Sequence, residues 1–260
     1  MATPRSVLVT GANRGLGLEL VRQLLLLPPQ GTADPGPRVL ATCRDPHGPG
    51  AQALRELASA HPQLTVLQLE VTSQESVAAL ALAVEKTLAG EGLNALINNA
   101  GVALMAPLGS VKAEDMTHSY NVNVVAPLMI TQALLPQLRI AAERNKAEPL
   151  GWGRAIVANI SSMLGSLHFA ALAPTGEWGY SYPAAKAALN MVTRCLLRDL
   201  QTSGVFVVSV NPGWVKTDMG GPEAPLTAQE SVAGMLRVLA TLTPEENGGF
   251  YDHEHKPVAW

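Results

Sequence analysis

A tyrosine and a lysine stand four residues apart in the stretch YPAAK, residues 182 to 186. In a helix, residues at this spacing share one face, so Tyr182 and Lys186 would lie side by side. A phenol has a pKa of about 10, and a neighbouring ammonium stabilises the phenolate and lowers that pKa toward the neutral range. The pair is therefore suited to giving a proton to an oxygen that gains negative charge. On its own, the same spacing also describes an ordinary surface pair.

Three glycines follow the first apolar run, in the stretch VLVTGANRGLG. Because glycine has no Cβ and adopts positive φ easily, Gly11, Gly15 and Gly17 would let backbone N–H groups approach a phosphate at the start of a helix. The spacing is GxxxGxG rather than the GxGxxG of many dinucleotide sites. A tight strand-to-helix turn explains the glycines equally well.

The end of the second apolar run, VLATCRDP, lacks the acidic residue that usually holds the adenosine ribose of a dinucleotide. Arg44 stands there instead, and with Arg14 of the glycine-rich loop it could flank a 2′-phosphate. This pair predicts NADPH/NADP as the cofactor rather than NADH. Two solvated surface arginines are the alternative, and Asp45, one place late for the ribose, argues partly against NADPH.

Alternating strands and helices must position these residues. Short apolar runs predict strands at 6–10, 38–43, 64–71, 93–98, 154–161, 205–211 and 248–252, separated by helices at 15–27, 51–60, 117–144 and 182–202. Capping boxes at Thr72/Glu75 and Thr227/Glu230 predict two further helices, and 28–37 reads as a Pro/Gly-rich linker. We therefore predict an α/β Rossmann fold: one domain over residues 1–260, with a doubly wound parallel sheet of about seven strands and helices on both faces.

Composition limits the partners of the chain. A net charge of −3 over 260 residues gives no electrostatic basis for binding nucleic acid or an anionic membrane. Cys43 and Cys195 are far apart in the sequence and are predicted to be free thiols in the cytoplasm. We find no signal peptide and no apolar run near the ~18–20 residues of a membrane span. His253 and His255 lack further ligands, so no metal is predicted.

Five motifs occur in a characteristic order along nearly the whole chain: TGANRGLG (10–17), NNAG (98–101), ISS (160–162), YPAAK (182–186) and NPG (211–213). With these motifs, the chain resembles the "classical" short-chain dehydrogenase/reductase family. It looks most like the carbonyl-reductase branch that includes the insect sniffer protein and the bacterial C-factor. The resemblance implies a nicotinamide cofactor and hydride transfer to a carbonyl, with the tyrosine as general acid.

The resemblance implies four catalytic residues, which are Asn123, Ser162, Tyr182 and Lys186. The serine would donate a hydrogen bond to the substrate oxygen, and the asparagine would anchor a water next to the lysine. Ser161 and Asn121 are the competing choices, and only spacing favours the residues named. Tyr180 lacks a lysine four residues further on.

The resemblance also implies a set of cofactor-binding residues. Glu70 occupies a slot near the adenine where the family more often has aspartate, and Val215 and Thr217 would meet the nicotinamide carboxamide. The full set is Gly11, Asn13, Arg14, Gly15, Leu16, Gly17, Arg44, Glu70, Val71, Asn98, Ala100, Gly101, Tyr182, Lys186, Pro212, Gly213, Val215 and Thr217.

The segment 163–181 between the serine and the tyrosine is longer than is common in the family. Leu164 and Trp178 from this segment, with Trp214, predict an apolar pocket above the nicotinamide. Such a pocket fits small apolar ketones, aldehydes or quinones. Packing of the segment onto the body of the fold is the alternative explanation.

The sequence therefore predicts an NADPH-dependent reductase of small carbonyl compounds. An NAD-dependent alcohol or steroid dehydrogenase is one alternative, which Arg44 argues against. A dinucleotide-binding signalling or regulatory protein with weak turnover is another. The apolar helices at 117–144 and 182–202 match the pair that forms the dimer interface in the family, so a homodimer is expected, although the insertion before Tyr182 could block that interface.

Overall fold

The computed structural model describes residues 3–28, 36–172 and 179–260, and its strands form one parallel sheet. The order is β3-β2-β1-β4-β5-β6-β7, so the winding reverses between β1 and β4. The strands are β1 Ser6–Val9, β2 Arg38–Cys43, β3 Leu64–Gln68, β4 Ala95–Asn98, β5 Ile156–Ile160, β6 Phe206–Asn211 and β7 Phe250–Asp252. The predicted doubly wound Rossmann fold is confirmed.

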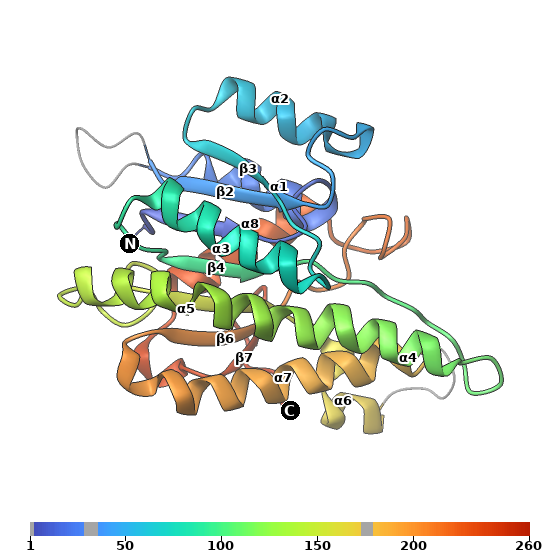
Figure 1. Cartoon of the computed structure of the whole chain (residues 1–260). Helices are drawn as coiled ribbons and strands as arrows, with labels where there is room; N and C mark the ends of the chain where they lie inside the picture. Colours follow the sequence, from blue (N-terminus) through green and yellow to red (C-terminus); the bar gives the residue numbers. More distant parts are fainter. Residues whose placement is uncertain (1–2, 29–35, 173–178) are drawn as a thin grey trace.

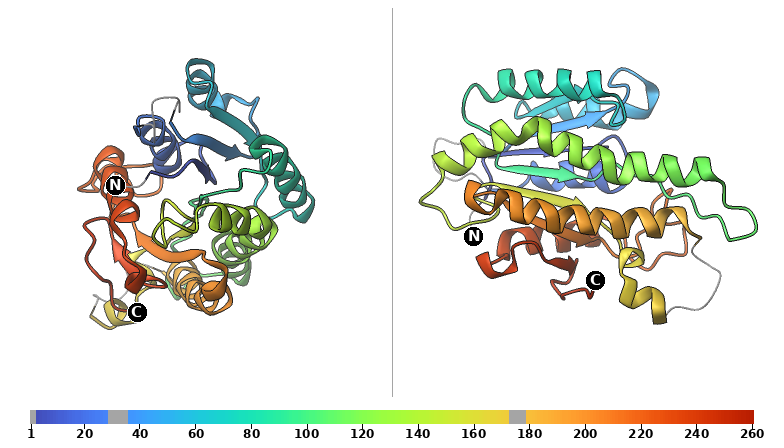
Figure 2. Two further views of the ribbon diagram at one scale, coloured as in Figure 1. Left: turned by 90° about the vertical axis from the view of Figure 1, so that its left-hand side faces the viewer. Right: turned by 60° about the horizontal axis from the view of Figure 1, so that its bottom comes forward.

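Helices cover both faces of the sheet (Figures 1 and 2). On one face lie α1 Gly15–Leu24, α2 Gln52–Ala60 and α8 Ala228–Thr241, and on the other α3 Gln74–Leu88, α5 Ala126–Arg144 and α7 Ser181–Leu200. Val7 and Val9 pack into the first core and Leu8 into the second, because successive strand residues point to opposite faces. A strand buried on both faces is therefore mostly apolar.

The long helix predicted at 117–144 begins earlier and is not uniform. It starts as α4, Ala113–Tyr120, passes through a π-helical turn at Asn121–Val125, and continues as α5. A π-turn widens the helix locally and is frequent at functional sites. Here it contains Asn123, one of the predicted catalytic residues.

Helix ends follow the predicted caps in one case and not in the other. Thr227 and Glu230 form the capping box of α8, as predicted. The cap of α3 is Ser73 rather than Thr72, since the Ser73 hydroxyl accepts from the Ser76 N–H. The segment after Ser162 forms a 3-10 turn, Met163–Gly165, and a short helix α6, Leu167–Leu172. Most of the linker predicted at 28–37 lies outside the described residues.

One helical stretch, Ala113–Arg144, is long and apolar enough to cross a membrane by length and composition, which the sequence analysis had not found. Half of its most apolar window is buried inside the fold. Its buried residues, among them Ile130, Leu134 and Leu138, pack in the core between the helices and the sheet. Burial of this kind is what the core helix of an α/β fold requires.

Candidate active site

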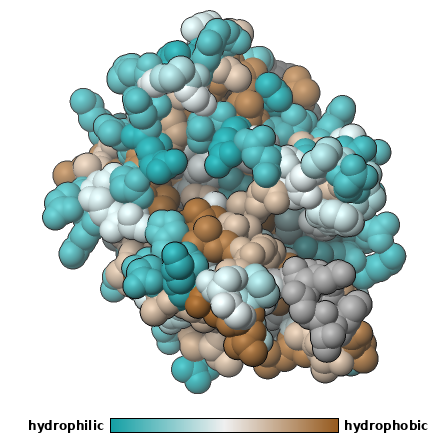
Figure 3. Space-filling model, turned by 90° about the vertical axis from the view of Figure 1, so that its right-hand side faces the viewer, coloured by the Kyte–Doolittle hydropathy of each residue, from teal (hydrophilic) through white to brown (hydrophobic). Residues whose placement is uncertain are grey.

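A cavity of about 940 Å³ opens at the carboxyl ends of the strands, where the winding of the sheet reverses. This is where open α/β sheets bind ligands, and the volume lies at the upper end of the range for ligand sites. Figure 3 shows this face, with hydrophobic side chains gathered beside a recess and hydrophilic ones around them. The walls include most of the predicted cofactor set: Gly11, Asn13, Arg14, Gly15, Leu16, Gly17, Arg44, Glu70, Val71, Ala100, Gly101, Tyr182, Lys186, Pro212 and Thr217.

The three glycines of the first loop serve different purposes. A Cβ on Gly11 would lie 2.9 Å from the Ala100 Cα, and one on Gly17 would overlap the Gly11 carbonyl oxygen. These two glycines allow backbone segments to pack closely. Gly15 has φ +54°, and the nearest atom to a Cβ there would be the Thr217 Cγ2 at 3.7 Å. Close backbone packing therefore accounts for Gly11 and Gly17, whereas Gly15 lines the cavity without a side chain, and its contact with a phosphate stays a prediction.

Asn99 ties the glycine loop to the end of β4, a role that the sequence analysis missed. Its Nδ2 donates to the carbonyl oxygens of Thr10 at 2.8 Å and Gly11 at 3.2 Å. The Thr10 Oγ1 accepts in return from the N–H groups of Asn99 and Ala100, both at 3.0 Å. Asn99 also lines the cavity. The second asparagine of NNAG was the available signal.

Asn98, predicted to bind the cofactor, does not line the cavity. Its side chain is 2% exposed, and its Nδ2 donates to the Asn159 Oδ1 at 2.9 Å and the Thr131 Oγ1 at 3.3 Å. The Asn98 side chain therefore joins β4 to β5 and α5 inside the fold, and a contact between Asn98 and the cofactor stays a prediction. The alternation of strand residues turns it inward while its neighbour faces the cavity.

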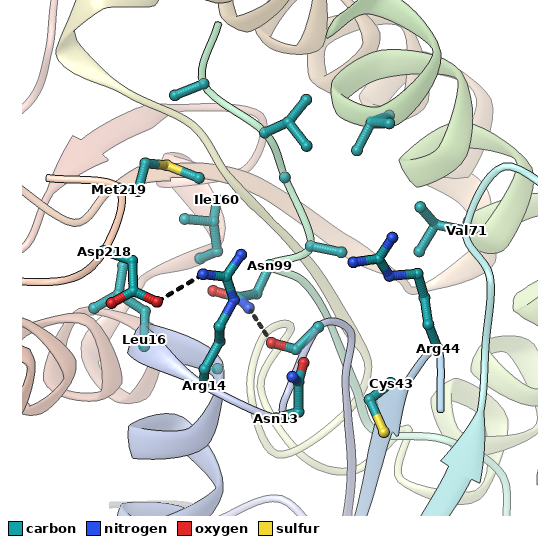
Figure 4. A pocket seen from close by; sticks show the side chains of 18 of the residues that line it. Asn13, Arg14, Leu16, Cys43, Arg44, Val71, Asn99, Ile160, Asp218 and Met219 are labelled. Carbon is teal, nitrogen blue, oxygen red and sulfur yellow. Dashed lines mark hydrogen bonds and ion pairs between the residues drawn. The ribbon is translucent and has the colours of Figure 1, made fainter. Parts of the chain in front are cut away.

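Two arginines lie on either side of Asn13 in the cavity (Figure 4). The Arg14 Nη1 forms an ion pair with the Asp218 Oδ2 at 2.7 Å, and both side chains are well exposed, at 67% and 78%. The Arg44 guanidinium has no ion-pair partner within residues 3–28, 36–172 and 179–260. An unpaired guanidinium at the wall of a cavity is well suited to an incoming phosphate.

Asp45 is directed into its own loop. Its Oδ1 accepts from the N–H groups of His47 at 3.0 Å and Gly48 at 2.9 Å. The Arg55 Nη1 holds the same loop by donating to the carbonyl oxygens of Pro46 and Gly48, at 3.0 and 2.7 Å. The argument that Asp45 could hold a ribose is weakened, because this carboxylate already caps a turn.

Tyr182 and Lys186 lie on one face of α7 at the end of the cavity. The Lys186 Nζ is 5.6 Å from the centroid of the Tyr182 ring and donates to the Ile160 carbonyl oxygen at 2.7 Å. Lys186 is only 5% exposed, and its burial lowers the pKa of the ammonium to about 8. At neutral pH the group is therefore mostly charged.

The pKa of Tyr182 differs from the prediction. Burial raises it, and the hydrogen bond with the Ser162 hydroxyl offsets the rise only in part. The spacing of Tyr182 and Lys186 predicts that the lysine lowers this pKa, whereas in the protein desolvation of the phenolate is the largest cause and raises it. The phenol is therefore fully protonated at neutral pH, as a general acid must be before it reacts.

The two members of each competing pair, Ser161 or Ser162 and Asn121 or Asn123, have different surroundings. The Ser161 Oγ is buried and donates to the Asn190 Oδ1 at 2.7 Å, whereas Ser162 is the serine that hydrogen-bonds to Tyr182. Asn123 is fully buried and exchanges two hydrogen bonds with the backbone of Val102, at 2.9 and 3.0 Å. Asn121 is exposed.

Gly101 brings Asn123 and Lys186 together. A Cβ on Gly101 would lie 2.9 Å from the Asn123 Oδ1 and 3.8 Å from the Lys186 Nζ. The absence of a side chain there lets the π-turn approach the lysine. Asn123 and Lys186 thus both lie against Gly101, and the water that Asn123 would anchor next to the lysine stays a prediction.

Several predicted residues are not among those that line the cavity, although Ser161, the neighbour of Ser162, is. Ser162, Asn123, Gly213 and Val215 do not line it, and Val215 is 4% exposed and bridges to Leu226. Leu164 and Trp214 do not line it either. Trp214 is 58% exposed and its Nε1 donates to the Gly220 carbonyl oxygen at 2.7 Å, while Trp178 lies outside the described residues.

The walls near the tyrosine contain residues that sequence motifs did not indicate. Leu104 and His118 come from the connection after β4 and from α4, and Met219 comes from the loop after β6. No motif identifies them, because topology alone brings these segments to the same edge of the sheet. Within the part of the chain that the structure describes, no three potential metal ligands are grouped, and the ring of His255 pairs with Glu246 at 2.9 Å.

Comparisons with known proteins agree with this architecture. A family model described as short chain dehydrogenase matches residues 5–226. An NADPH-bound carbonyl reductase from chicken fatty liver is 45% identical, with a TM-score of 0.91, and the match covers 99% of this chain and 100% of that chain. The carbonyl reductase Sniffer of D. melanogaster is 37% identical, with a TM-score of 0.91 over the same shares. The C-signal protein of Myxococcus xanthus is 43% identical over 169 residues, 65% of this chain and 93% of that protein.

Proposed function

Because the chain belongs to the short-chain dehydrogenase family, as a member of the branch that contains Sniffer and C-signal, we propose that it is an NADPH-dependent reductase of small carbonyl compounds. The observation that carries the proposal is the protonated Tyr182 next to the buried ammonium of Lys186, at one end of a cavity that the glycine loop and Arg44 enclose. Apolar ketones, aldehydes and quinones are the proposed substrates, since Leu104 and Met219 contribute apolar walls.

The residues of the cavity fit a dinucleotide. Gly15, with positive φ and no side chain of its own, lets a pyrophosphate approach the first turn of α1. Within the residues that the structure describes, the Arg44 guanidinium has no ion-pair partner and can take a 2′-phosphate. Glu70 and Val71 also line the cavity, and Val71 lies beside Arg44 (Figure 4). Thr217 lines the cavity next to Gly15 of the glycine loop. NADPH, when bound, supplies the hydride that reduces the carbonyl carbon.

The remaining chemistry belongs to the chain. Tyr182 holds its proton at neutral pH and gives it to the substrate oxygen, while the Ser162 hydroxyl donates a hydrogen bond to the same oxygen. The ammonium of Lys186 then stabilises the phenolate that remains until a proton returns from solvent. Asn123, against Gly101 and close to the lysine, is placed to anchor a water for that return.

A cofactor and substrate panel tests the proposal. NADPH and NADH are each supplied with ketones, aldehydes and quinones, and turnover is followed by the absorbance of the reduced cofactor. We expect turnover with NADPH, strong preference over NADH, and near-complete loss in Tyr182→Phe, which lacks the proton. Turnover should fall as the pH rises through about 8, where Lys186 loses its charge. An inactive protein across the panel, or equal use of NADH, would contradict the proposal.

A signalling protein that binds the dinucleotide with weak turnover is the second candidate. The similarity to the protein named C-signal favours it. The two candidates differ in their dependence on Tyr182: a signalling effect that survives Tyr182→Phe belongs to the second, and one that is lost belongs to the reductase.

We also propose that the protein is a cytoplasmic homodimer. The face that α4, α5 and α7 share exposes Met116, Tyr120, Met129 and Met191, with 38 to 64% of each residue accessible. Burial of such a face in a partner copy removes apolar surface from water. Light scattering at micromolar concentration tests the dimer, and Met191→Glu, which places a charge on this face, should yield a monomer. Both free thiols fit a reducing compartment.

A further inference from the structure

Two buried carboxamides hold the chain on either side of Ser162. Asn190 is 3% exposed and Asn211 is 5% exposed. We propose that this pair positions the Ser162 hydroxyl for the reaction, and that the pair acts through the neighbours of the serine rather than by touching substrate. This inference rests on the proposed reductase function.

Asn190 connects α7 to the chain before and after the serine. Its Oδ1 accepts from the Ser161 Oγ at 2.7 Å, and its Nδ2 donates to the Gly165 carbonyl oxygen at 3.3 Å. Asn190 lies four residues after Lys186, so it continues the face of α7 that contains the tyrosine and the lysine. The same helix thus fixes both the proton donor and the serine loop.

Asn211 connects the serine loop to the end of β6. Its Oδ1 accepts two backbone N–H groups, from Met163 at 3.2 Å and from Gly213 at 3.3 Å. The first of these follows Ser162 directly. The second belongs to the loop that leads to Thr217 on the cavity wall. One oxygen atom therefore holds the serine loop and this loop in register.

Close backbone packing completes the arrangement. A Cβ on Gly165 would lie 2.7 Å from the Lys186 carbonyl carbon and 2.9 Å from the Ala187 nitrogen, so the turn rests directly on α7. Ser161, Met163 and Gly165 are thus each tied down. The Ser162 Oγ between the first two accepts from the Leu164 N–H at 3.2 Å, which leaves the hydroxyl proton for Tyr182. A loop fixed at alternate residues presents the intervening hydroxyl in one orientation, which catalysis requires within fractions of an ångström.

Three variants and one control test this role. Asn190→Ala and Asn211→Ala remove the carboxamides, and Asn211→Asp keeps an oxygen acceptor for both N–H groups. Asn145→Ala is the matched control: Asn145 is also buried, at 7% exposed, and its Nδ2 donates to the Ala141 carbonyl oxygen at 2.8 Å, but it lies beside Arg38 at the opposite end of the strands. Measurements are kcat, the KM for NADPH and carbonyl, and amide hydrogen exchange of the segment 156–172.

We expect the two alanine variants to lose about tenfold or more in kcat with the KM for NADPH unchanged, and Asn211→Asp to recover most of the loss. Exchange at the Met163 amide should rise in Asn211→Ala, and the control should resemble the wild type. If the wild type is active, two results would overturn the inference but leave the reductase function intact. One is a kcat within about twofold of the wild type in both alanine variants, and the other is an equal loss of kcat in Asn145→Ala. An inactive wild type would refute the reductase function, and unchanged exchange in the segment would then overturn the positioning role as well.

Discussion

Replacing Lys186 with methionine should change how the stability of the protein depends on pH. The lysine is 5% exposed, and burial lowers its pKa from 10.5 to about 8. A charged ammonium is therefore disfavoured in the folded state relative to the unfolded chain. Methionine fills a similar volume without a charge, so Lys186→Met separates this electrostatic penalty from packing.

The size of the effect follows from the two pKa values of Lys186. Below pH 8 the ammonium is charged in both states, and the folded protein bears a penalty of about 3 kcal/mol, at about 1.4 kcal/mol per pKa unit. Between about pH 8 and 10.5 the folded state loses this proton while the unfolded state keeps it, so the free energy of unfolding rises with pH. From pH 7 to 9.5 the wild type should gain about 2 kcal/mol relative to Lys186→Met.

The assay is urea denaturation of both proteins at pH 7 and 9.5, and the quantity compared is the change in their stability difference. Packing differences and other titrating groups that both proteins share cancel in that change. Lys86→Met, the same replacement at an exposed position of α3, is the control and should show no such change. A stability difference that is equal at the two pH values would refute the reasoning, because a lysine with an ordinary pKa stays charged throughout. We also expect Lys186→Met to lose reductase activity.

Three other substitutions test separate parts of the structure. Arg44→Ala should raise the KM for NADPH about tenfold or more and leave the KM for NADH nearly unchanged, since only NADPH has the 2′-phosphate. Equal changes in the two KM values would contradict this prediction. Gly11→Ala places a Cβ 2.9 Å from the Ala100 Cα at φ +65°, and should lower the free energy of unfolding more than Gly90→Ala, where φ is +87° but no atom lies within 4 Å. Thr227→Ala removes the capping box of α8 and should lower that free energy by about 1 kcal/mol, with kcat unchanged.

The parts of the fold that a local pattern determines were predictable. A strand such as SVLV needs only its own residues to indicate burial on both faces, and the box at Thr227 and Glu230 satisfies its own N–H groups. The pairing of β1 with β4 depends on chain topology, and no local pattern gives it. The same holds for the π-turn at Asn121–Val125, whose sequence resembles that of an ordinary helix.

In the candidate site, too, local sequence patterns predicted some features, and others depend on the tertiary structure. The spacing of Tyr182 and Lys186 identified their shared face, but the direction of the shift in the tyrosine pKa depends on burial, which spacing does not give. NNAG indicated the right segment but not which asparagine faces the cavity. Trp214 was assigned to a substrate pocket by its apolar ring, yet its Nε1 donates to Gly220 within its own loop. Residue type predicts what a side chain can do, whereas its direction comes from the backbone.

Helix α7 explains why so many polar groups are buried at one place in the fold. Tyr182, Lys186, Asn190 and Thr193 follow one another at helical spacing along the face that packs on the sheet. The lysine binds the Ile160 carbonyl oxygen, Asn190 holds Ser161, and Thr193 meets Asn159 and Ser209 on neighbouring strands. Burying polar groups costs free energy because they lose their contacts with water, and the lowered pKa of Lys186 reflects that cost. A face made only of apolar residues would not bear it. In return, one rigid helix aligns the proton donor Tyr182, the cation Lys186 and Asn190, which supports the serine loop.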